Sequence, residues 1–350
     1  MTDNWNLIGH EWAVDMLKKH VIHGTTRHAY LFAGPPGIGR RTLALRFAQA
    51  LNCATPSEPG VPCGQCRDCK QIEEMKHADL NVIKPLIKAR EGDQEIILDP
   101  KGEKFTPDLN GEIRIFQIRY IQKFVNLRPY NSKHRVLIFL RFHQASIEAS
   151  NALLKTLEDA PAYAVLILTA DTPEQLLPTI VSRCEVLRLR PLKIDEVRQA
   201  LEEKGFESQQ SKWIAHISGG RYGYARQLIG SESLLLEREE HLNDLQRLIS
   251  ASRVEKFAYA EKLSKNKDTM RQALLIWLSY WRDVMLSTSR ATTPLVNMDR
   301  NLEIENIASQ MDLSSARLMV RGLESTLEKL DGNVNTRLLA EVLLLDLPKL

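Results

Sequence analysis

A glycine-rich segment, Gly34–Thr42, constrains the fold of this chain more than any other feature. It reads GPPGIGRRT, follows the apolar run His28–Ala33 and precedes a helical pattern at Leu43–Leu51. A strand, a glycine loop and a helix in this order form the context of a phosphate-binding loop. Glycines let backbone N–H groups turn toward an anion, and the start of the following helix favours negative charge there. The segment therefore predicts a P-loop type of α/β fold.

The side chains that a working ATP loop needs are absent from this segment. The pattern requires a Lys followed by Ser or Thr after its last glycine, and these two positions hold Arg40 and Arg41. Acids at the end of a core strand hold Mg²⁺ and activate water in such ATPases, yet no Asp or Glu lies between Ile113 and Ile147. We therefore expect no ATP hydrolysis, while binding of a phosphate group by the two arginines stays open. The degenerate phosphate loop comprises Gly34, Gly37, Gly39, Arg40, Arg41 and Thr42.

Short apolar runs alternate with helical patterns through the first half of the chain. The expected strands are Tyr30–Ala33, Leu80–Ile83, Arg135–Leu140, Val165–Thr169 and Val186–Leu189. Continuous apolar runs are typical of strands covered on both faces, and the alternation favours a doubly wound parallel sheet over residues 1–190. Residues 84–112 are polar and predict a long loop, with a β-hairpin around Ile96–Leu98 as its one candidate element. After Pro191 the patterns are helical only, including a helix at Ser314–Leu330 with Ser314 as its N-cap.

Length and composition exclude several classes of protein. A chain of 350 residues suits two or three domains, and its 43% hydrophobic and 26% charged composition is that of a soluble globular protein. A net charge of +3 does not by itself indicate nucleic acid. The apolar runs are too short to span a bilayer, and no signal peptide is visible. We therefore expect a cytoplasmic protein, in which cysteines are metal ligands or buried thiols rather than disulfides.

Four of the five cysteines are closely spaced. Cys53, Cys63, Cys66 and Cys69 form the pattern C-x9-C-x2-C-x2-C. Four thiolates satisfy the tetrahedral preference of Zn²⁺ without leaving an open position, so the pattern predicts a structural zinc site. Free cysteines and an iron–sulfur cluster, which also takes four thiolates, are the alternatives. The fifth cysteine, Cys184, is predicted to be a small buried side chain.

The acid-free stretch between Ile113 and Ile147 is also rich in basic residues. They are Arg114, Arg119, Lys123, Arg128, Lys133, Arg135 and Arg141. Such a stretch can form a basic face for a nucleic-acid backbone. A solvated face is the alternative, and the sequence shows no accompanying aromatic stacking pattern.

Three further segments carry a resemblance to a known family. They are Asn151–Glu158 (NALLKTLE), Pro173–Cys184 (PEQLLPTIVSRC) and Asn333–Leu347. Together with the cysteine module they resemble the clamp-loader ATPases of the AAA+ class, and the match covers nearly the whole chain apart from residues 84–112. Within this family, the degraded loop is similar to a non-hydrolysing subunit rather than to the ATP-hydrolysing gamma/tau type.

The resemblance implies three domains. They are an AAA+ domain at residues 1–190 with an inserted four-cysteine zinc module at 53–69, a small helical lid at 191–235, and an all-α C-terminal collar at 236–350 that oligomerises. In such loaders the Arg of the Ser-Arg-Cys motif, here Arg183, reaches into the ATP site of a neighbouring subunit as an arginine finger. Without the resemblance, the sequence only indicates that Arg183 is a cation placed favourably at the C-terminus of its own helix.

The implied partners are gamma/tau-like ATPase subunits and a delta-like subunit, with the sliding clamp and primed DNA reached through the complex. The cysteine spacing gives zinc as the structural cofactor, and the short apolar runs give no membrane. Two alternatives stay open at this level: a gamma/tau-like ATPase that tolerates Arg40 in its loop, and a zinc-bearing nucleic-acid-binding protein outside replication.

Overall fold

A computed structural model describes residues 5–86, 111–331 and 334–348, and it divides the chain into two compact units. Unit 1 contains Met1–Leu192 and Arg221–Gly223, and unit 2 contains Lys193–Gly220 and Tyr224–Leu350. The predicted division of the helical part into a lid and a collar stays a prediction. Within the described residues, none of the helices is long and apolar enough to cross a membrane.

Unit 1 is built around a five-stranded parallel sheet with strand order β2-β3-β4-β1-β5. Its strands are β1 (Ala29–Ala33), β2 (Leu80–Ile83), β3 (Arg135–Phe139), β4 (Ala164–Ala170) and β5 (Glu185–Arg188). Each agrees with its predicted apolar run to within a residue or so. Strand β1 lies between β4 and β5, and the loop that follows β1 therefore begins near the middle of the sheet's carboxyl edge.

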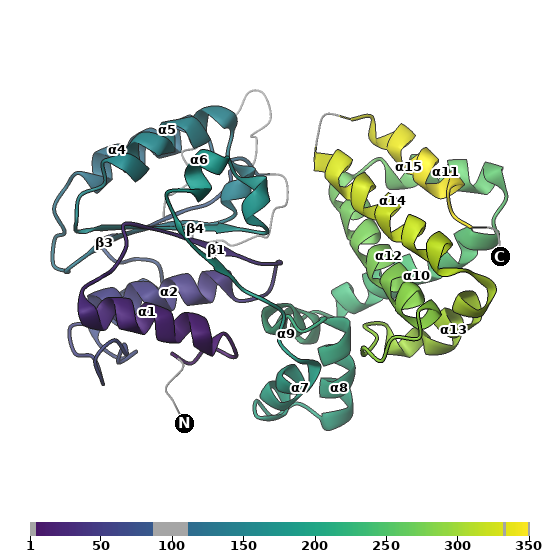
Figure 1. The fold of residues 1–350 in the computed structure, drawn as a ribbon, viewed down its shortest axis with the longest axis horizontal. Helices are drawn as coiled ribbons and strands as arrows, with labels where there is room; N and C mark the ends of the chain where they lie inside the picture. Colours follow the sequence, from purple (N-terminus) through teal and green to yellow (C-terminus); the bar gives the residue numbers. More distant parts are fainter. Residues whose placement is uncertain (1–4, 87–110, 332–333, 349–350) are drawn as a thin grey trace. The chain divides into compact units, whose positions relative to one another are not determined.

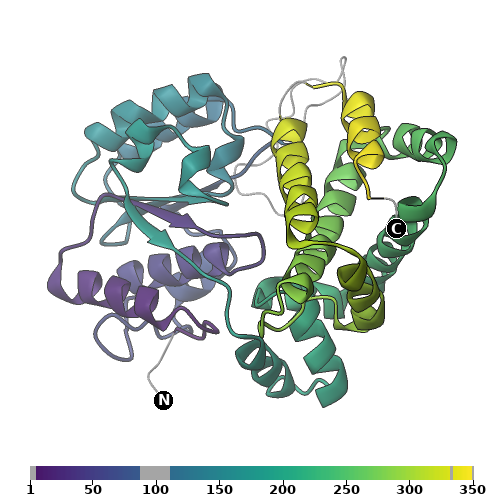
Figure 2. The same ribbon diagram turned by 45° about the vertical axis from the view of Figure 1, so that its right-hand side comes forward.

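Helices cover both faces of this sheet (Figure 1, Figure 2). The helices of unit 1 are α1 (Glu11–His23), α2 (Arg40–Asn52), α3 (Arg67–Glu73), α4 (Ile115–Val125), α5 (Ile147–Glu158) and α6 (Pro178–Val181), with short 3₁₀ turns η1 (Phe142–Gln144) and η2 (Pro173–Gln175). Alternate strand residues face opposite sides: Tyr30 and Phe32 join the core beneath α1 and α2, whereas Leu31 joins the core beneath α4, α5 and α6. This confirms the predicted doubly wound, P-loop-type α/β domain.

The segment predicted as a long loop is only partly described. Its two ends meet in an antiparallel bridge, in which the N–H groups of Leu86 and Glu112 each donate to the other's carbonyl oxygen at 3.0 and 2.9 Å. The hairpin considered around Ile96–Leu98 lies outside the described residues.

Unit 2 is helical in its described residues, as predicted for the C-terminal half. Its helices are α7 (Ile194–Glu202), α8 (Ser208–Ile217), α9 (Tyr222–Gly230, whose first residues belong to unit 1), α10 (Glu232–Ser250), α11 (Arg253–Leu263), α12 (Lys267–Thr288), η3 (Met298–Arg300), α13 (Asn301–Gln310), α14 (Leu313–Asp331) and α15 (Thr336–Leu345). Trp277 and Trp281 of α12 are fully buried in its core. The predicted N-cap Ser314 is wrong: helix α14 already begins at Leu313, and the carboxylate of Asp312 accepts the N–H of Ser315 at 2.9 Å.

Candidate functional site

The phosphate loop connects β1 to α2 at the carboxyl edge of the sheet. Gly34 is buried there, and its N–H donates to the carbonyl of Ala170 at the end of β4 at 3.2 Å. A Cβ atom at Gly34 would approach the Leu189 carbonyl to 2.7 Å. Gly37 and Gly39 have φ angles of 79° and 114°, a region that side chains disfavour. The backbone conformation of the loop therefore favours glycine at all three positions, whether or not the loop binds a ligand.

Arg40 occupies the position of the missing lysine and is turned to a carboxylate of its own chain. Its Nη1 lies 2.7 Å from Oδ1 of Asp171, the first residue after β4. The Arg40 side chain is 10% exposed and that of Asp171 is 29% exposed. His143 of η1 lies at the other carboxylate oxygen, with its Nε2 4.0 Å from Asp171 Oδ2. An internal ion pair thus fills the place where a P-loop lysine meets phosphate.

Arg41 and Thr42 lie on the first turn of α2. The guanidinium of Arg41 donates to the sulfur of Met75, just beyond α3, at 3.4 Å. Burial lowers the pKa of the Arg41 guanidinium, with the Glu73 carboxylate acting in the opposite direction. Thr42 is exposed on the first turn of α2. Both arginines that the sequence offered for a phosphate group therefore contact protein partners.

The end of β3, where the catalytic acids of an ATPase would stand, carries Leu140 and Arg141. Leu140 is buried, and Arg141 adopts a left-handed conformation with φ of 53° while its N–H donates to Thr169 Oγ1 at 2.8 Å. Asp171, directly after β4, is an acid at the carboxyl edge of the sheet. It was not singled out from the sequence, because acids were considered only after the strand Val136–Leu140. An acid directly after a continuous apolar run, as in LTAD, is the signal that points to it.

A second segment of unit 1 packs directly on the loop. The N–H of Gly223, at the start of α9, donates to the carbonyl of Gly37 at 2.9 Å. A Cβ atom at Gly223 would lie 2.7 Å from the same oxygen, so this approach requires glycine. The loop is therefore held at two points, by Asp171 beneath it and by the Arg221–Gly223 segment.

The four predicted cysteine ligands converge in space. The sulfur atoms of Cys53, Cys63, Cys66 and Cys69 all lie within 4.8 Å of one another. Cys53 Sγ is 3.5 Å from Cys63 Sγ and 3.9 Å from Cys66 Sγ. A tetrahedral Zn²⁺ with Zn–S bonds of about 2.3 Å places its sulfur ligands about 3.8 Å apart. The donor set and its spacing therefore fit a single zinc ion.

Backbone N–H groups point at these sulfurs and stabilise the thiolate form. Cys63, Cys66 and Cys69 donate to the sulfurs of Cys53, Cys63 and Cys66 at 3.4, 3.3 and 3.4 Å. The Cys66 N–H, followed by the Thr55 hydroxyl, lowers the pKa of the Cys63 thiol to about 6. Burial raises the pKa of the Cys53 and Cys69 thiols.

The cysteine module is fastened to α2, the helix that begins at the phosphate loop. Cys53 directly follows the last residue of α2, and Gln49 of this helix donates to the Cys69 carbonyl at 2.8 Å. Arg46 pairs with Glu73 of α3 at 2.6 Å. The indole of Trp5 donates to the Gly60 carbonyl of the module at 2.9 Å. The module therefore closes the end of α2 that is remote from the loop.

Arg183 lies just after α6, on the opposite face of the sheet from α2. Its Nη2 lies 2.5 Å from Oε1 of Glu158, the last residue of α5, and its Nη1 donates to the Thr179 carbonyl at 2.9 Å. The Arg183 side chain is 35% exposed and that of Glu158 is 51% exposed. The sequence singled out Arg183 but gave no partner for it.

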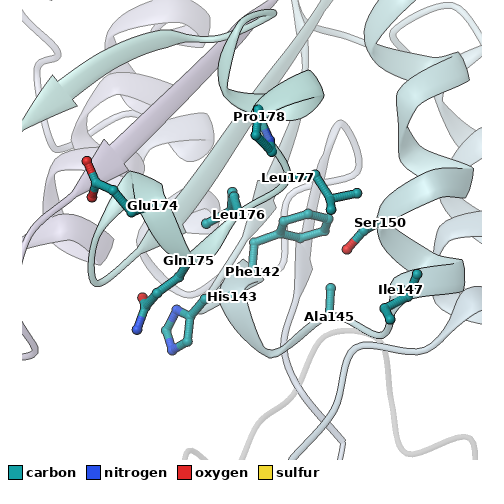
Figure 3. A pocket seen from close by; sticks show the side chains of 10 residues that line it. All are labelled: Phe142, His143, Ala145, Ile147, Ser150, Glu174, Gln175, Leu176, Leu177 and Pro178. Atoms are coloured by element: carbon teal, nitrogen blue, oxygen red, sulfur yellow. The ribbon is translucent and has the colours of Figure 1, made fainter. Parts of the chain in front are cut away.

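A pocket of about 300 Å³ lies beside α6 in the same unit (Figure 3). Phe142, Leu176 and Leu177 form its apolar part, and Ser150 and His143 lie around them (Figure 3). Pro178 begins α6 at its edge, so the pocket neighbours the helix that supports Arg183.

One residue of the predicted basic face, Arg135, does not lie on the surface. Arg135 is buried, pairs with the buried Asp79 at 3.2 Å, and stacks 4.0 Å from the centroid of the Phe124 ring. It is therefore a core residue and no candidate for a nucleic-acid backbone. Three exposed aromatic residues, Phe116, Tyr120 and Tyr130, lie on the same segment and were not singled out from the sequence.

Curated relatives of this chain are subunits of DNA polymerase III. The subunit tau of Salmonella typhimurium is 30% identical over 56% of this chain and 27% of its own length. The subunit delta' of Bacillus subtilis is 26% identical over 91% of this chain and 90% of its own length. The chain thus spans about a quarter of the tau relatives that it matches. Among solved structures, a DNA polymerase III gamma subunit-related protein of Thermotoga maritima aligns over 95% of this chain and 97% of its own, at 18% identity and a TM-score of 0.39.

Two family models cover the chain on either side of the short helices α7 and α8. One, described as DNA polymerase III, delta subunit, matches residues 9–193, and the other, described as DNA polymerase III, delta subunit, C terminal, matches residues 232–349. The first covers the whole sheet, the phosphate loop, the cysteine module and Arg183. The chain therefore belongs to the DNA polymerase III delta-subunit family.

Proposed function

We propose that this chain is a non-hydrolysing clamp-loader subunit of the delta-prime type, which assembles with ATPase subunits and helps load a sliding clamp onto primed DNA during replication. The observation that carries the proposal is the Arg40–Asp171 ion pair in the phosphate loop. The alignment with the Bacillus subtilis delta' relative, over 91% of this chain and 90% of that protein, supports the delta-prime assignment. The partners would be gamma/tau-like ATPase subunits and a delta-like subunit.

The ion pair supports the absence of hydrolysis for a chemical reason. Phosphoryl transfer depends on a cation at the outer phosphates and on acids that hold Mg²⁺. Arg40 directs its charge to Asp171, and Leu140 replaces an acid at the end of β3. Arg40 offsets the negative charge of the Asp171 carboxylate, which makes this group a weaker ligand for Mg²⁺. The loop is therefore a retained element of the fold, and its architecture no longer supports turnover.

Arg183 would act at a site that this chain does not own. It follows α6 with a third of its side chain exposed, and it carries donors that are not used by Glu158 or Thr179. An arginine finger stabilises the charge that develops on a transferring phosphoryl group. In the proposed assembly Arg183 supplies this charge in trans to the ATP bound by the adjacent subunit.

The cysteine cluster would hold one structural zinc ion through Cys53, Cys63, Cys66 and Cys69. A structural zinc supplies binding free energy to the folded state and no chemistry. The four sulfur atoms lie within 4.8 Å of one another, which supports one ion over an iron–sulfur cluster, in which several metal ions separate the ligands. The site would fix the polypeptide that follows α2.

One observation favours a second candidate function. The tau relatives are 29–30% identical to this chain over about 197 residues, which is compatible with a gamma/tau-like ATPase that uses Arg40 in place of lysine. The two functions differ in whether the isolated chain turns over ATP.

The test is a steady-state ATPase assay on the isolated chain, followed by assembly with its partner subunits. We expect no turnover by the isolated chain, and turnover that is abolished by Arg40→Ala would establish the ATPase instead. In the complex we expect Arg183→Ala to preserve assembly and to lower the ATPase rate. Arg188→Ala is the matched control, because Arg188 is an exposed arginine of β5 that pairs with Glu174 at 2.8 Å.

A further inference from the structure

Arg183 is held in place by two elements of its own unit. One guanidinium nitrogen donates to the Thr179 carbonyl of α6, and the other lies against the Glu158 carboxylate at the end of α5. Thr179 precedes Ile180, and Glu158 follows Leu157, and both of these neighbours are almost fully buried. The two anchors therefore belong to helices that are fixed by the core.

The position of Glu158 is electrostatically unfavourable for a carboxylate on its own. A helix C-terminus carries partial negative charge and favours cations. Glu158 is the last residue of α5, and Asp159 follows it as the C-cap. The helix therefore does not stabilise the Glu158 carboxylate, whereas the guanidinium of Arg183, 2.5 Å away, does.

The contact pattern leaves the outer part of the guanidinium available. An arginine has five N–H donors in a rigid plane. Among the described contacts, Thr179 and Glu158 take one bond to each terminal nitrogen, and Arg183 remains 35% exposed. Two anchors on the planar guanidinium fix its orientation before binding. The side chain then loses less conformational entropy when it meets a phosphate.

We infer that Glu158 is a positioning residue for Arg183: its carboxylate orients the guanidinium so that the remaining donors face the phosphates of the adjacent subunit. The inference rests on the proposed function of Arg183 and adds the residue that prepares it. Glu158 does not touch the nucleotide. An exposed ion pair shifts an equilibrium by roughly fivefold at most, so loss of Glu158 weakens the finger without removing it.

The experiment uses the complex reconstituted with its ATPase partner subunits and measures kcat and KM for ATP. Four versions of this chain are compared: wild type, Glu158→Ala, Arg183→Ala and the double variant. We expect Glu158→Ala to lower the finger-dependent kcat by roughly two- to fivefold with KM unchanged, and to have no further effect in the Arg183→Ala background. Glu158→Gln, which keeps an acceptor oxygen, should recover most of the loss. Glu174→Gln is the matched control, since it weakens an exposed pair with Arg188 on the same unit.

The outcomes separate the inference from the function on which it rests. If Arg183→Ala lowers kcat but Glu158→Ala does not, positioning by Glu158 is refuted and the finger stands. If Glu158→Ala lowers kcat equally with and without Arg183, Glu158 acts by another route and the inference is again refuted. If Arg183→Ala itself leaves kcat unchanged, the proposed finger fails. Should the Ala variant not assemble, Glu158→Asp, which draws the carboxylate back from Arg183, gives the same comparison at smaller amplitude.

Discussion

The buried pair between Arg40 and Asp171 offers the sharpest test of the phosphate loop. The perturbation is Asp171→Asn, which keeps the size of the side chain and one acceptor oxygen but removes its charge. The guanidinium of Arg40, 10% exposed, then lacks its counter-charge. If this pair is what keeps the loop in its present form, the variant must destabilise unit 1.

The expected magnitude follows from the burial of the two partners. Removing one partner of a fully buried pair costs about 3–5 kcal/mol, and an exposed pair contributes about 0–1 kcal/mol. Arg40 is close to the first limit, whereas Asp171 is 29% exposed. We therefore expect a loss of about 2 kcal/mol. For a unit of this size that corresponds to a fall in Tm of roughly 4–8 °C.

The assay combines thermal unfolding with native-state hydrogen exchange of the β1 and β4 amides. Exchange reports on unit 1 alone, and Gly34 is bonded directly to Ala170 at the end of β4. The matched control is Glu158→Gln, which weakens an ion pair of the same unit that is more exposed on both sides. We expect the control to change Tm by no more than about 2–4 °C, because an exposed pair contributes about 0–1 kcal/mol.

A clear result would refute the reasoning. If Asp171→Asn shifts Tm by no more than the control does, the pair does not stabilise the loop, and the argument that it replaces nucleotide chemistry loses its basis. The same holds if the β1 and β4 amides exchange as slowly in the variant as in the wild type.

Two further predictions concern the cysteine module and the core beside it. Cys63→Ser should lower the bound zinc below one equivalent and lower Tm, measured by metal analysis and calorimetry; full zinc at an unchanged Tm would rule out the four-cysteine site. Burial alone would raise the pKa of Asp79, but the N–H groups of Tyr130 and Asn131, together with Arg135, hold it below its usual 3.8. This carboxylate therefore stabilises the fold above about pH 4 and loses that contribution as the pH falls through its folded pKa. Asp79→Asn should cost about 3 kcal/mol at pH 7 and flatten the acid side of the stability curve in urea titrations, and an unchanged pH profile would contradict this.

The elements of the fold were predictable because their signals are local. Continuous apolar runs located all five strands, since a strand covered on both faces needs apolar side chains at every position. The strand Leu80–Ile83 was predicted with the bounds it has. The N-cap of α14 was wrong by two residues, because Asp312 and Ser314 are both suitable caps and only the backbone decides between them.

The candidate site was predictable only where its residues are neighbours in the sequence. The cysteines and the loop glycines lie within short segments, and their spacing carries the information. The carboxylate partners of Arg40 and Arg183 lie far from them in the sequence, because each comes from the end of another strand or helix. Asp171 and Glu158 are therefore known from the structure, and so is the fact that Arg135 belongs to the core.

Two of the arginine–carboxylate pairs of unit 1, Arg40–Asp171 and Arg183–Glu158, differ in a way that favours different roles. Opening a buried pair leaves an uncompensated charge inside the protein, whereas opening an exposed pair costs little, because water replaces the lost partner. Arg40 is nearly enclosed with Asp171, and Arg183 and Glu158 are both substantially exposed. Only Arg183 can therefore direct its charge to an incoming phosphate without a large cost in stability. The difference supports the proposal that the phosphate loop is a structural element of the chain, and that Arg183, on the other face of the sheet, is the arginine that meets phosphate.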